Sequence, residues 1–105
     1  MERIHKVEVR LSHRIDVGEA AKYLLSALDC DDWYVACQRE HLLVVQLSEH
    51  GRHKYAVRFE CTSAVEKAIY HGSKAWSLSV IPLGDEGDLA PGRIAELKAG
   101  LEKLE

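Results

Sequence analysis

Three strand-like segments follow one another in the middle of the chain, and they constrain the fold more than any other feature. Residues 33–38, 42–48 and 54–61 are rich in bulky and β-branched side chains, which favour strands. The polar breaks between them, 39–41 and 49–52, are short enough for hairpins, and the second contains a glycine. Consecutive strands joined by such short loops pair antiparallel. The sequence therefore predicts a three-stranded antiparallel meander.

Two further segments have the period of two that is typical of half-buried strands. Residues 4–12 alternate strictly between apolar and polar side chains, and residues 75–81 repeat this pattern. Pro82 ends the second segment because proline has no backbone N–H to donate. With the meander, these segments give a sheet of about five strands. Their apolar side consists of Val7, Val9, Leu11, Trp76, Leu78 and Val80.

Capping residues mark the beginnings of two helices. Asp16 and Glu19 have the spacing of a capping box, and apolar side chains then recur every three or four residues. This pattern predicts a helix over 17–28. Ser63, with a glutamate three residues later, opens a short second helix that ends before Gly72.

A third helix is predicted at the C-terminal end. Residues 83–90 form a short acidic, glycine-rich connection, and Pro91 then stands in the first turn of a helix over 91–104. Its apolar residues have the a/d spacing of a coiled-coil seam for about two heptads. These residues are Ile94, Leu97, Leu101 and Leu104.

The order of these elements, β-α-β-β-β-α-β-α, predicts an α+β fold in a single domain spanning residues 1–105. It resembles a ferredoxin-like split βαβ unit with one more strand in the meander and an added C-terminal helix. In that arrangement the first two helices cover one face of the antiparallel sheet. The core on that face would contain Val7, Val9, Leu11, Tyr55, Val57, Phe59, Trp76, Leu78 and Val80.

Composition and charge exclude several classes of protein. The chain has 14 basic and 17 acidic residues and a net charge of −3, which disfavours a globally basic nucleic-acid binder. No apolar run approaches the roughly 20 residues that cross a bilayer, and the charged start lacks the apolar stretch of a secretory signal. Three cysteines fit free buried thiols better than a disulfide framework. We expect a cytoplasmic protein with no membrane partner.

No motif in the chain indicates catalysis. The sequence contains no nucleophile elbow, phosphate-binding loop, dinucleotide fingerprint or His-Glu-x-x-His pair. Six histidines are many for this length, and the His50-x-x-His53 spacing suits a transition metal. A small metal-dependent enzyme built on these two histidines is therefore one hypothesis. We favour a protein without enzymatic activity or cofactor.

A second hypothesis is a single-stranded nucleic-acid-binding module. Sheets that bind single strands stack bases on exposed aromatic side chains within a basic groove. The predicted outer face offers one stacking candidate among basic residues, but Glu8 and Glu60 alternate with them. The candidate residues are Lys6, Arg10, Tyr34, Arg52, Lys54 and Arg58.

The hypothesis that we favour rests on residues 42–45, which are apolar on both faces of their predicted strand. Such strands are usually covered on both faces. The cover is either the C-terminal helix or another subunit, and the sequence leaves both open. We expect a non-catalytic binding domain, a homodimer that recognises a protein or a small ligand near its subunit interface. The interface residues would be Leu42, Val44, Leu97, Leu101 and Leu104.

Overall fold

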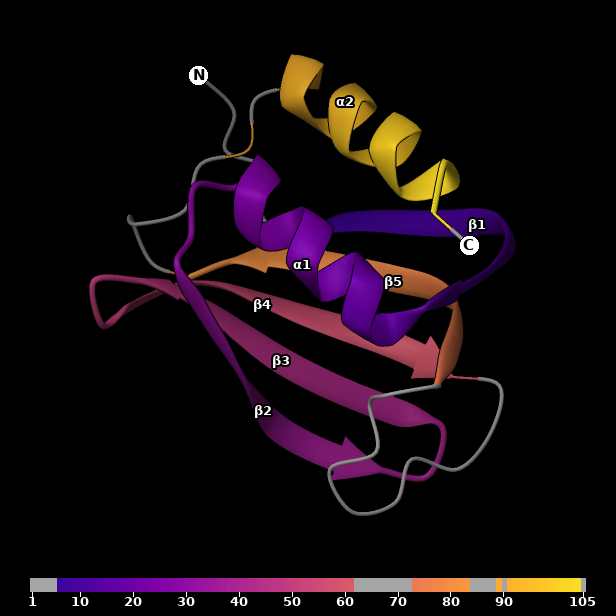
Figure 1. Ribbon diagram of the computed structural model, residues 1–105, viewed down its shortest axis with the longest axis horizontal. Coiled ribbons are helices and arrows are strands. Elements are labelled where there is room, and N and C mark those ends of the chain that lie inside the picture. The colour runs from indigo at the N-terminus through magenta and orange to yellow at the C-terminus, as the bar shows by residue number, and fades with distance from the viewer. Residues whose placement is uncertain (1–5, 62–72, 84–88, 90, 105) are drawn as a thin grey trace.

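A five-stranded antiparallel sheet and two helices make up the described part of the chain (Figure 1). The computed structural model describes residues 6–61, 73–83, 89 and 91–104. The strand order is β1-β5-β4-β3-β2, and every neighbouring pair is antiparallel. Along the chain the elements are β1 (Val7–Asp16), α1 (Val17–Ala27), β2 (Asp32–Arg39), β3 (Leu42–Glu49), β4 (Arg52–Cys61), β5 (Lys74–Pro82) and α2 (Pro91–Glu102).

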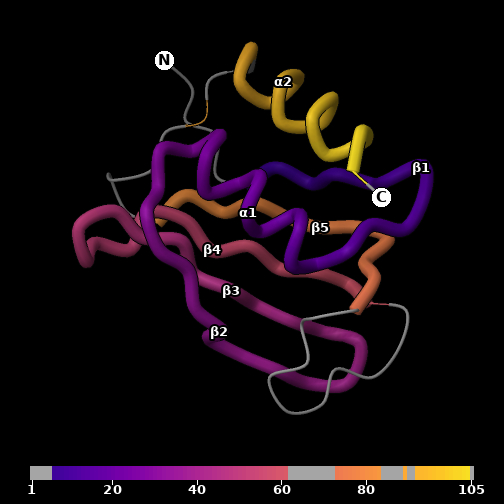
Figure 2. The backbone as a smooth tube through the Cα atoms, in the orientation of Figure 1, coloured from indigo at the N-terminus to yellow at the C-terminus, as the bar shows by residue number. Residues whose placement is uncertain are grey.

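The predicted meander is confirmed, but the ferredoxin-like arrangement is wrong. β1 and β2 form the two edges of the sheet, and α1 crosses the whole sheet between them (Figure 2). β5 pairs directly with β4, so β2 to β5 form one continuous run of antiparallel strands. β1 pairs with the other edge of β5, and no split βαβ unit forms among the described residues. The helix predicted over 63–71 lies outside the described residues.

The first helix begins where its capping residues predict. The carboxylate of Asp16 accepts a hydrogen bond from the backbone N–H of Glu19 at 3.1 Å. The N–H of Val17 donates to the carbonyl of Ser73 at 2.9 Å, which ties the start of α1 to the beginning of β5. Both contacts satisfy backbone donors that the first turn of a helix leaves without an intrahelical partner.

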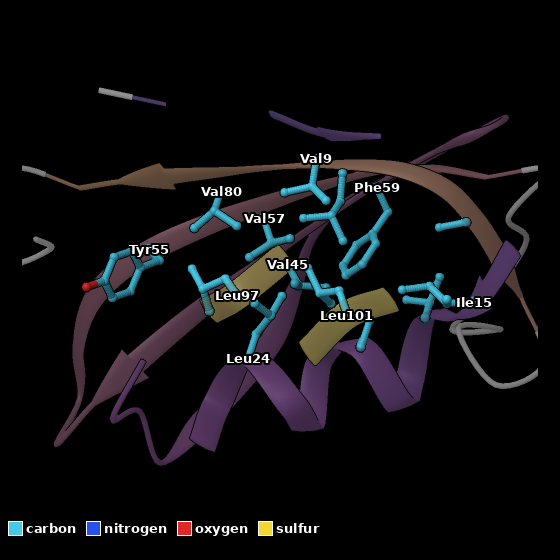
Figure 3. Close-up of a cluster of buried hydrophobic side chains, with 14 of the residues drawn as sticks. Val9, Ile15, Leu24, Val45, Tyr55, Val57, Phe59, Val80, Leu97 and Leu101 are labelled. Atoms are coloured by element: carbon cyan, nitrogen blue, oxygen red, sulfur yellow. The ribbon is translucent and has the colours of Figure 1, made fainter. Parts of the chain in front are cut away.

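Both helices pack on the same face of the sheet, and the core lies between them and the strands (Figures 1 and 3). Leu24 of α1 and Leu97 and Leu101 of α2 point into this core (Figure 3). They meet strand residues such as Val45 and Val57, which are fully buried. Burying side chains of this size contributes roughly 1.5–3 kcal/mol each.

The C-terminal helix therefore packs on its own sheet. Leu97 and Leu101 are 1% and 0% exposed, and Leu104 packs partly buried against the same core. The spacing of these leucines suits a coiled-coil seam, but α1 and β1 already occupy the apolar face of α2. Leu97 and Leu101 have no surface left to give to a second subunit.

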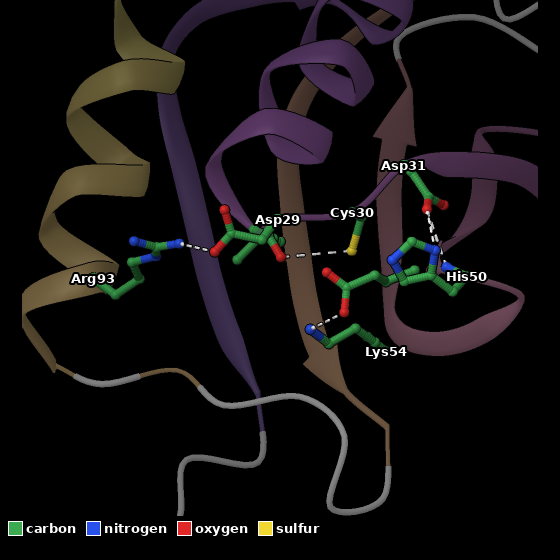
Figure 4. Close-up of polar contacts among 8 residues, drawn as sticks. Asp29, Cys30, Asp31, His50, Lys54 and Arg93 are labelled. Atoms are coloured by element: carbon green, nitrogen blue, oxygen red, sulfur yellow. Dashed lines mark hydrogen bonds and ion pairs between the residues drawn. The ribbon is translucent and has the colours of Figure 1, made fainter.

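Polar contacts hold α2 near its start and in its middle. Near the start, the guanidinium of Arg93 donates to the carbonyl of Ala27 and lies 3.3 Å from the Asp29 carboxylate (Figure 4). In the middle, the hydroxyl of Tyr23 donates to the carbonyl of Glu96 at 3.0 Å. These contacts fix α2 against α1.

The last turn of α2 is bound to β1. The carboxylate of Glu102 accepts hydrogen bonds from the hydroxyl of Ser12 and from its backbone N–H, the latter at 3.1 Å. The ring of His13 contacts the carbonyl of Leu104 and lies 3.8 Å from the same carboxylate. We call Ser12, His13 and Glu102 the β1–α2 latch.

Two glycines of α2 differ in their surroundings, and this difference gives a first prediction. A methyl group on Gly100 would overlap the ring of Tyr23, whereas one on Gly92 would meet nothing within 4 Å. We expect Gly100→Ala to lower the free energy of unfolding by about 1–3 kcal/mol, although alanine favours helices. Gly92→Ala is the control and should leave it unchanged or raise it by up to about 1 kcal/mol. Urea unfolding measures both, and equal stabilisation by the two substitutions would contradict the packing of Tyr23 on α2.

The β1–α2 latch gives a second prediction, on pH. The hydrogen bonds from Ser12 lower the pKa of Glu102 from its ordinary value of 4.5. The ionised carboxylate therefore stabilises the folded state fully above pH 4.5, and this stabilisation is lost as the pH falls through the lowered folded-state pKa. We expect Glu102→Gln to lower the melting temperature at pH 7, and the difference from wild type to shrink in acid.

The control for this experiment is Glu96→Gln, which changes an exposed residue on the same helix. It should alter the melting temperature little at either pH. A melting-temperature difference for Glu102→Gln that stays constant from neutral pH to about pH 3 would contradict the latch.

Candidate functional site

No helix or strand of the described residues covers the face of the sheet opposite the helices, and we call it the open face. Its side chains lie in cross-strand rows. In one row, Ser77 of β5 pairs with Arg10 of β1 and with Glu60 of β4. In the next, Ser79 pairs with Glu8 and with Arg58. The small serines therefore form a floor along β5 between two charged walls. This floor is the base of a groove of about 240 Å³, which we call the serine groove.

The charges on the two walls alternate in sign. Glu60 stands across Ser77 from Arg10, and Arg58 stands across Ser79 from Glu8. The walls are two strand spacings apart, roughly 10 Å between backbones. Glu8 pairs instead with Lys6, which directly precedes β1, at 2.9 Å, and this contact lowers the pKa of Glu8.

Trp76 lies at one end of the serine groove, on the surface rather than in the core. The register places Glu60 opposite Ser77 but Cys61 opposite Ala75, so Trp76 is an extra residue in a β-bulge. Ala75 and Leu78 on either side keep their buried positions, at 0% and 1% exposure, while Trp76 is 40% exposed. The expectation that Trp76 belongs to the core is therefore wrong, because the bulge turns its side chain to the face of the sheet opposite the core.

A wider, shallow depression of about 870 Å³ opens beside Trp76, and we call it the Trp76 depression. It lies where the ends of β1, β4 and β5 meet the turn between β2 and β3. Within the part of the chain that the structure describes, the side chains of Arg14, Arg58 and Glu60 make no ion pair or hydrogen bond. The depression is lined by Arg14, Glu40, His41, Leu42, Arg58, Glu60, Cys61 and Trp76.

Another polar group of the depression, His41, is held in place by its neighbours. Its Nδ1 lies 3.2 Å from the carbonyl of Cys61, and its Nε2 lies 3.6 Å from the carboxylate of Glu40. The backbone carbonyl of His41 also accepts from the N–H of Cys61 at 3.0 Å. The β2–β3 turn is thereby fixed to the end of β4.

Two observations bear on the chemistry that the depression can support. Burial raises the pKa of the Cys61 thiol, so this sulfur stays protonated at neutral pH and is a poor nucleophile. Burial also raises the pKa of Cys30, which lies outside the open face. The described residues contain no group of three or more side chains that could hold a metal ion. Charged side chains without a described partner, beside an exposed aromatic ring, can contact a polar and planar ligand.

The two histidines of the metal hypothesis have separate partners. His50 lies 3.5 Å from the carboxylate of Asp31 (Figure 4). The ring of His53 packs edge-on against Tyr34 at a centroid distance of 5.2 Å, and the Tyr34 hydroxyl lies 2.9 Å from its Nε2. The geometry therefore does not bring His50 and His53 to one ion.

The six residues of the nucleic-acid hypothesis are divided by the structure. Lys6, Arg10 and Arg58 line the serine groove. Tyr34 lies elsewhere on the open face, where its hydroxyl also contacts Gln46. Arg52 lies at the β3–β4 hairpin, and Lys54 pairs there with Glu49 at 3.5 Å (Figure 4). The aromatic residue beside the basic side chains of the groove is instead Trp76. It was not identified from the sequence, because its alternation with serines predicts a position in the core.

No protein-family model, curated protein or solved structure matches this chain. Neither helix of the described residues has the length and apolar character to cross a membrane.

The bulge gives a third prediction. Because Trp76 is largely outside the core, Trp76→Thr should change the free energy of unfolding by less than about 1 kcal/mol. Threonine is chosen because it favours strands, as tryptophan does. Leu78→Ala, two residues along the same strand, removes a buried side chain and should cost about 2–5 kcal/mol. Urea unfolding measures both values. A loss at Trp76 as large as that at Leu78 would contradict the bulge.

Proposed function

We propose that this chain is a non-catalytic binding domain that works as a homodimer and holds its ligand on the open face of the sheet, beside the dimer contact. One observation supports this most: on the open face, β2 and β3 carry no charge between Asp32 and Arg39 at the two ends of β2, whereas β4, β5 and β1 carry several charged side chains. We call these regions the uncharged half and the charged half. The two halves suit two different contacts.

The uncharged half is proposed as the dimer contact. Leu42 and Val44 are half-buried there, and Cys37 stands opposite Val44. The described helices both lie on the other face and give these side chains no cover. Apolar patches rimmed by polar residues are typical of association sites, and a two-fold contact buries the same patch on both copies.

The charges around this half favour a second copy over a strongly charged partner. Arg58 and Glu60 stand opposite Val44 and Leu42 on the neighbouring strand. Arg39, the last residue of β2, stands opposite Leu42, and Glu40 follows it in the turn. These four residues are two positive and two negative side chains. A two-fold copy presents the same mixed rim, so Arg39 and Glu40 can face opposite charges there, while Arg58 and Glu60 stay on the ligand side.

The charged half is proposed as the ligand site. Arg14, Arg58 and Glu60 line one depression, and none of them has a partner among the described residues. Leu42 lines the same depression and belongs to the uncharged half, so the ligand would sit next to the second subunit. The leucines of α2 play no part in this contact, since the core already contains Leu97 and Leu101.

The dimer proposal gives a fourth prediction. Native mass spectrometry of the wild-type protein at micromolar concentration should show a dimer, and Val44→Arg should show a monomer, because the new charge would lie in the apolar contact. Circular dichroism should show that Val44→Arg is still folded.

Ser26→Arg is the matched control, because Ser26 is exposed on α1, on the opposite side of the sheet. It should remain dimeric. A monomeric wild type, or a Val44→Arg variant that stays dimeric, would overturn the proposed contact.

A further inference from the structure

We propose that the Trp76 depression binds a nucleoside monophosphate whose base carries N–H donors on its pairing edge, with guanine the best fit. This inference rests on the proposed function, because it names the ligand of the charged half of the open face. It is argued from three side chains that converge on one depression: Trp76, Arg58 and Glu60, with Arg14 beside them.

The first step is the aromatic surface. A bulge that turns a tryptophan outward gives up the burial of a large apolar side chain. Trp76 keeps 40% of its surface exposed, between Ala75 and Leu78 that are buried. An indole face held by a bulge in a central strand is a rigid platform on which a planar ring can stack.

The second step is the anion. The guanidiniums of Arg14 and Arg58 reach the depression from β1 and β4, and neither is neutralised by a described residue. Guanidinium groups match the oxygens of phosphate in pairs of parallel hydrogen bonds. Two unpaired arginines at one depression therefore favour a phosphate group.

The third step is the carboxylate. Glu60 is half-buried, pairs across β4–β5 with Ser77, and so stands directly beside the bulge that carries Trp76. An ionised carboxylate is an acceptor with two oxygens. It needs a ligand that brings N–H donors. The N1–H and N2–H groups of guanine lie side by side on one edge and match the two oxygens, whereas uracil offers a single donor there.

Other ligand classes use fewer of these groups. A neutral sugar would leave both arginines without a partner, and an aromatic acid would leave Glu60 without a donor. A long polyanion would bring further phosphates against Glu8 and Glu40, and the chain itself has a net charge of −3. The depression, at about 870 Å³, has room for a ligand of this size lying on its surface.

The test is calorimetric titration of the wild-type protein with guanosine monophosphate, guanosine and uridine monophosphate at one ionic strength. We expect guanosine monophosphate to bind, and each of the other two to bind about tenfold or more weakly, since guanosine lacks the phosphate and uridine monophosphate offers Glu60 one N–H donor instead of two. Arg58→Gln should reduce the preference over guanosine, because only Arg14 then faces the phosphate, and Glu60→Gln should remove the preference over uridine monophosphate. If either substitution acted only by disturbing the fold, it would weaken the binding of all three ligands equally.

Trp76→Ala should weaken every base-bearing ligand, and Tyr34→Ala is its matched control. Tyr34 is 41% exposed, close to the 40% of Trp76, and lies on the same face but outside the depression. Equal effects of the two substitutions, or no binding of guanosine monophosphate, would overturn the inference. So would tighter binding of short single-stranded oligonucleotides that grows with their length and falls steeply with salt, because it would indicate a polyanion surface.

Failure of this inference is distinguishable from failure of the proposed dimer. If the protein is a dimer in the mass spectrum and guanosine monophosphate does not bind, the ligand assignment fails and the dimer contact stands. If the protein is a monomer and guanosine monophosphate binds with the expected preferences, the dimer contact fails and the site stands.

Discussion

Both described helices pack on one face of the sheet, and the properties of the other face depend on this. α1 runs from β1 at one edge to β2 at the other, and α2 fills the remaining space over β1. Because these helices use the apolar side chains of one face, the opposite face is left to the residues that alternate with them. The cross-strand register then decides what that face contains. Serines of β5 lie between charged residues of β1 and β4, and one extra residue in β5 turns Trp76 to the same side. The candidate site is therefore a product of strand pairing.

Local patterns predicted the elements better than their arrangement. The five strands and the helix after Asp16 were predicted within a few residues, because alternation and capping are local signals. The place of β1 at the edge of the sheet was not, because an element order of this kind is compatible with more than one strand order. The leucine spacing in α2 was ambiguous for a similar reason: one apolar stripe serves a chain's own core or a partner equally well.

The position of Trp76 on the open face could not be predicted from the sequence. Trp76, Leu78 and Val80 alternate with serines, and this pattern alone puts all three side chains on one face. The bulge depends on how β5 matches the ends of β4 and β1, where the register shifts in both pairings. A tryptophan in an apolar alternation carries no local sign of that shift. Arg14 and Glu60 were missed as members of the site for a related reason, because their significance depends on being near Trp76.

The charges at the Trp76 depression, which have no partner among the described residues, also bear on selectivity. Arg58 and Glu60 lie two residues apart on one strand, on one face, with opposite charges. A ligand that satisfies the guanidinium alone brings an anion near the carboxylate, and one that satisfies the carboxylate alone leaves the guanidinium without a partner. Discrimination therefore depends as much on the protein group that a wrong ligand leaves unsatisfied as on the hydrogen bonds that the right ligand makes. Such a site favours ligands that carry an acceptor and a donor at a fixed separation, and the rigid ladder of β4 and β5 fixes that separation on the protein side.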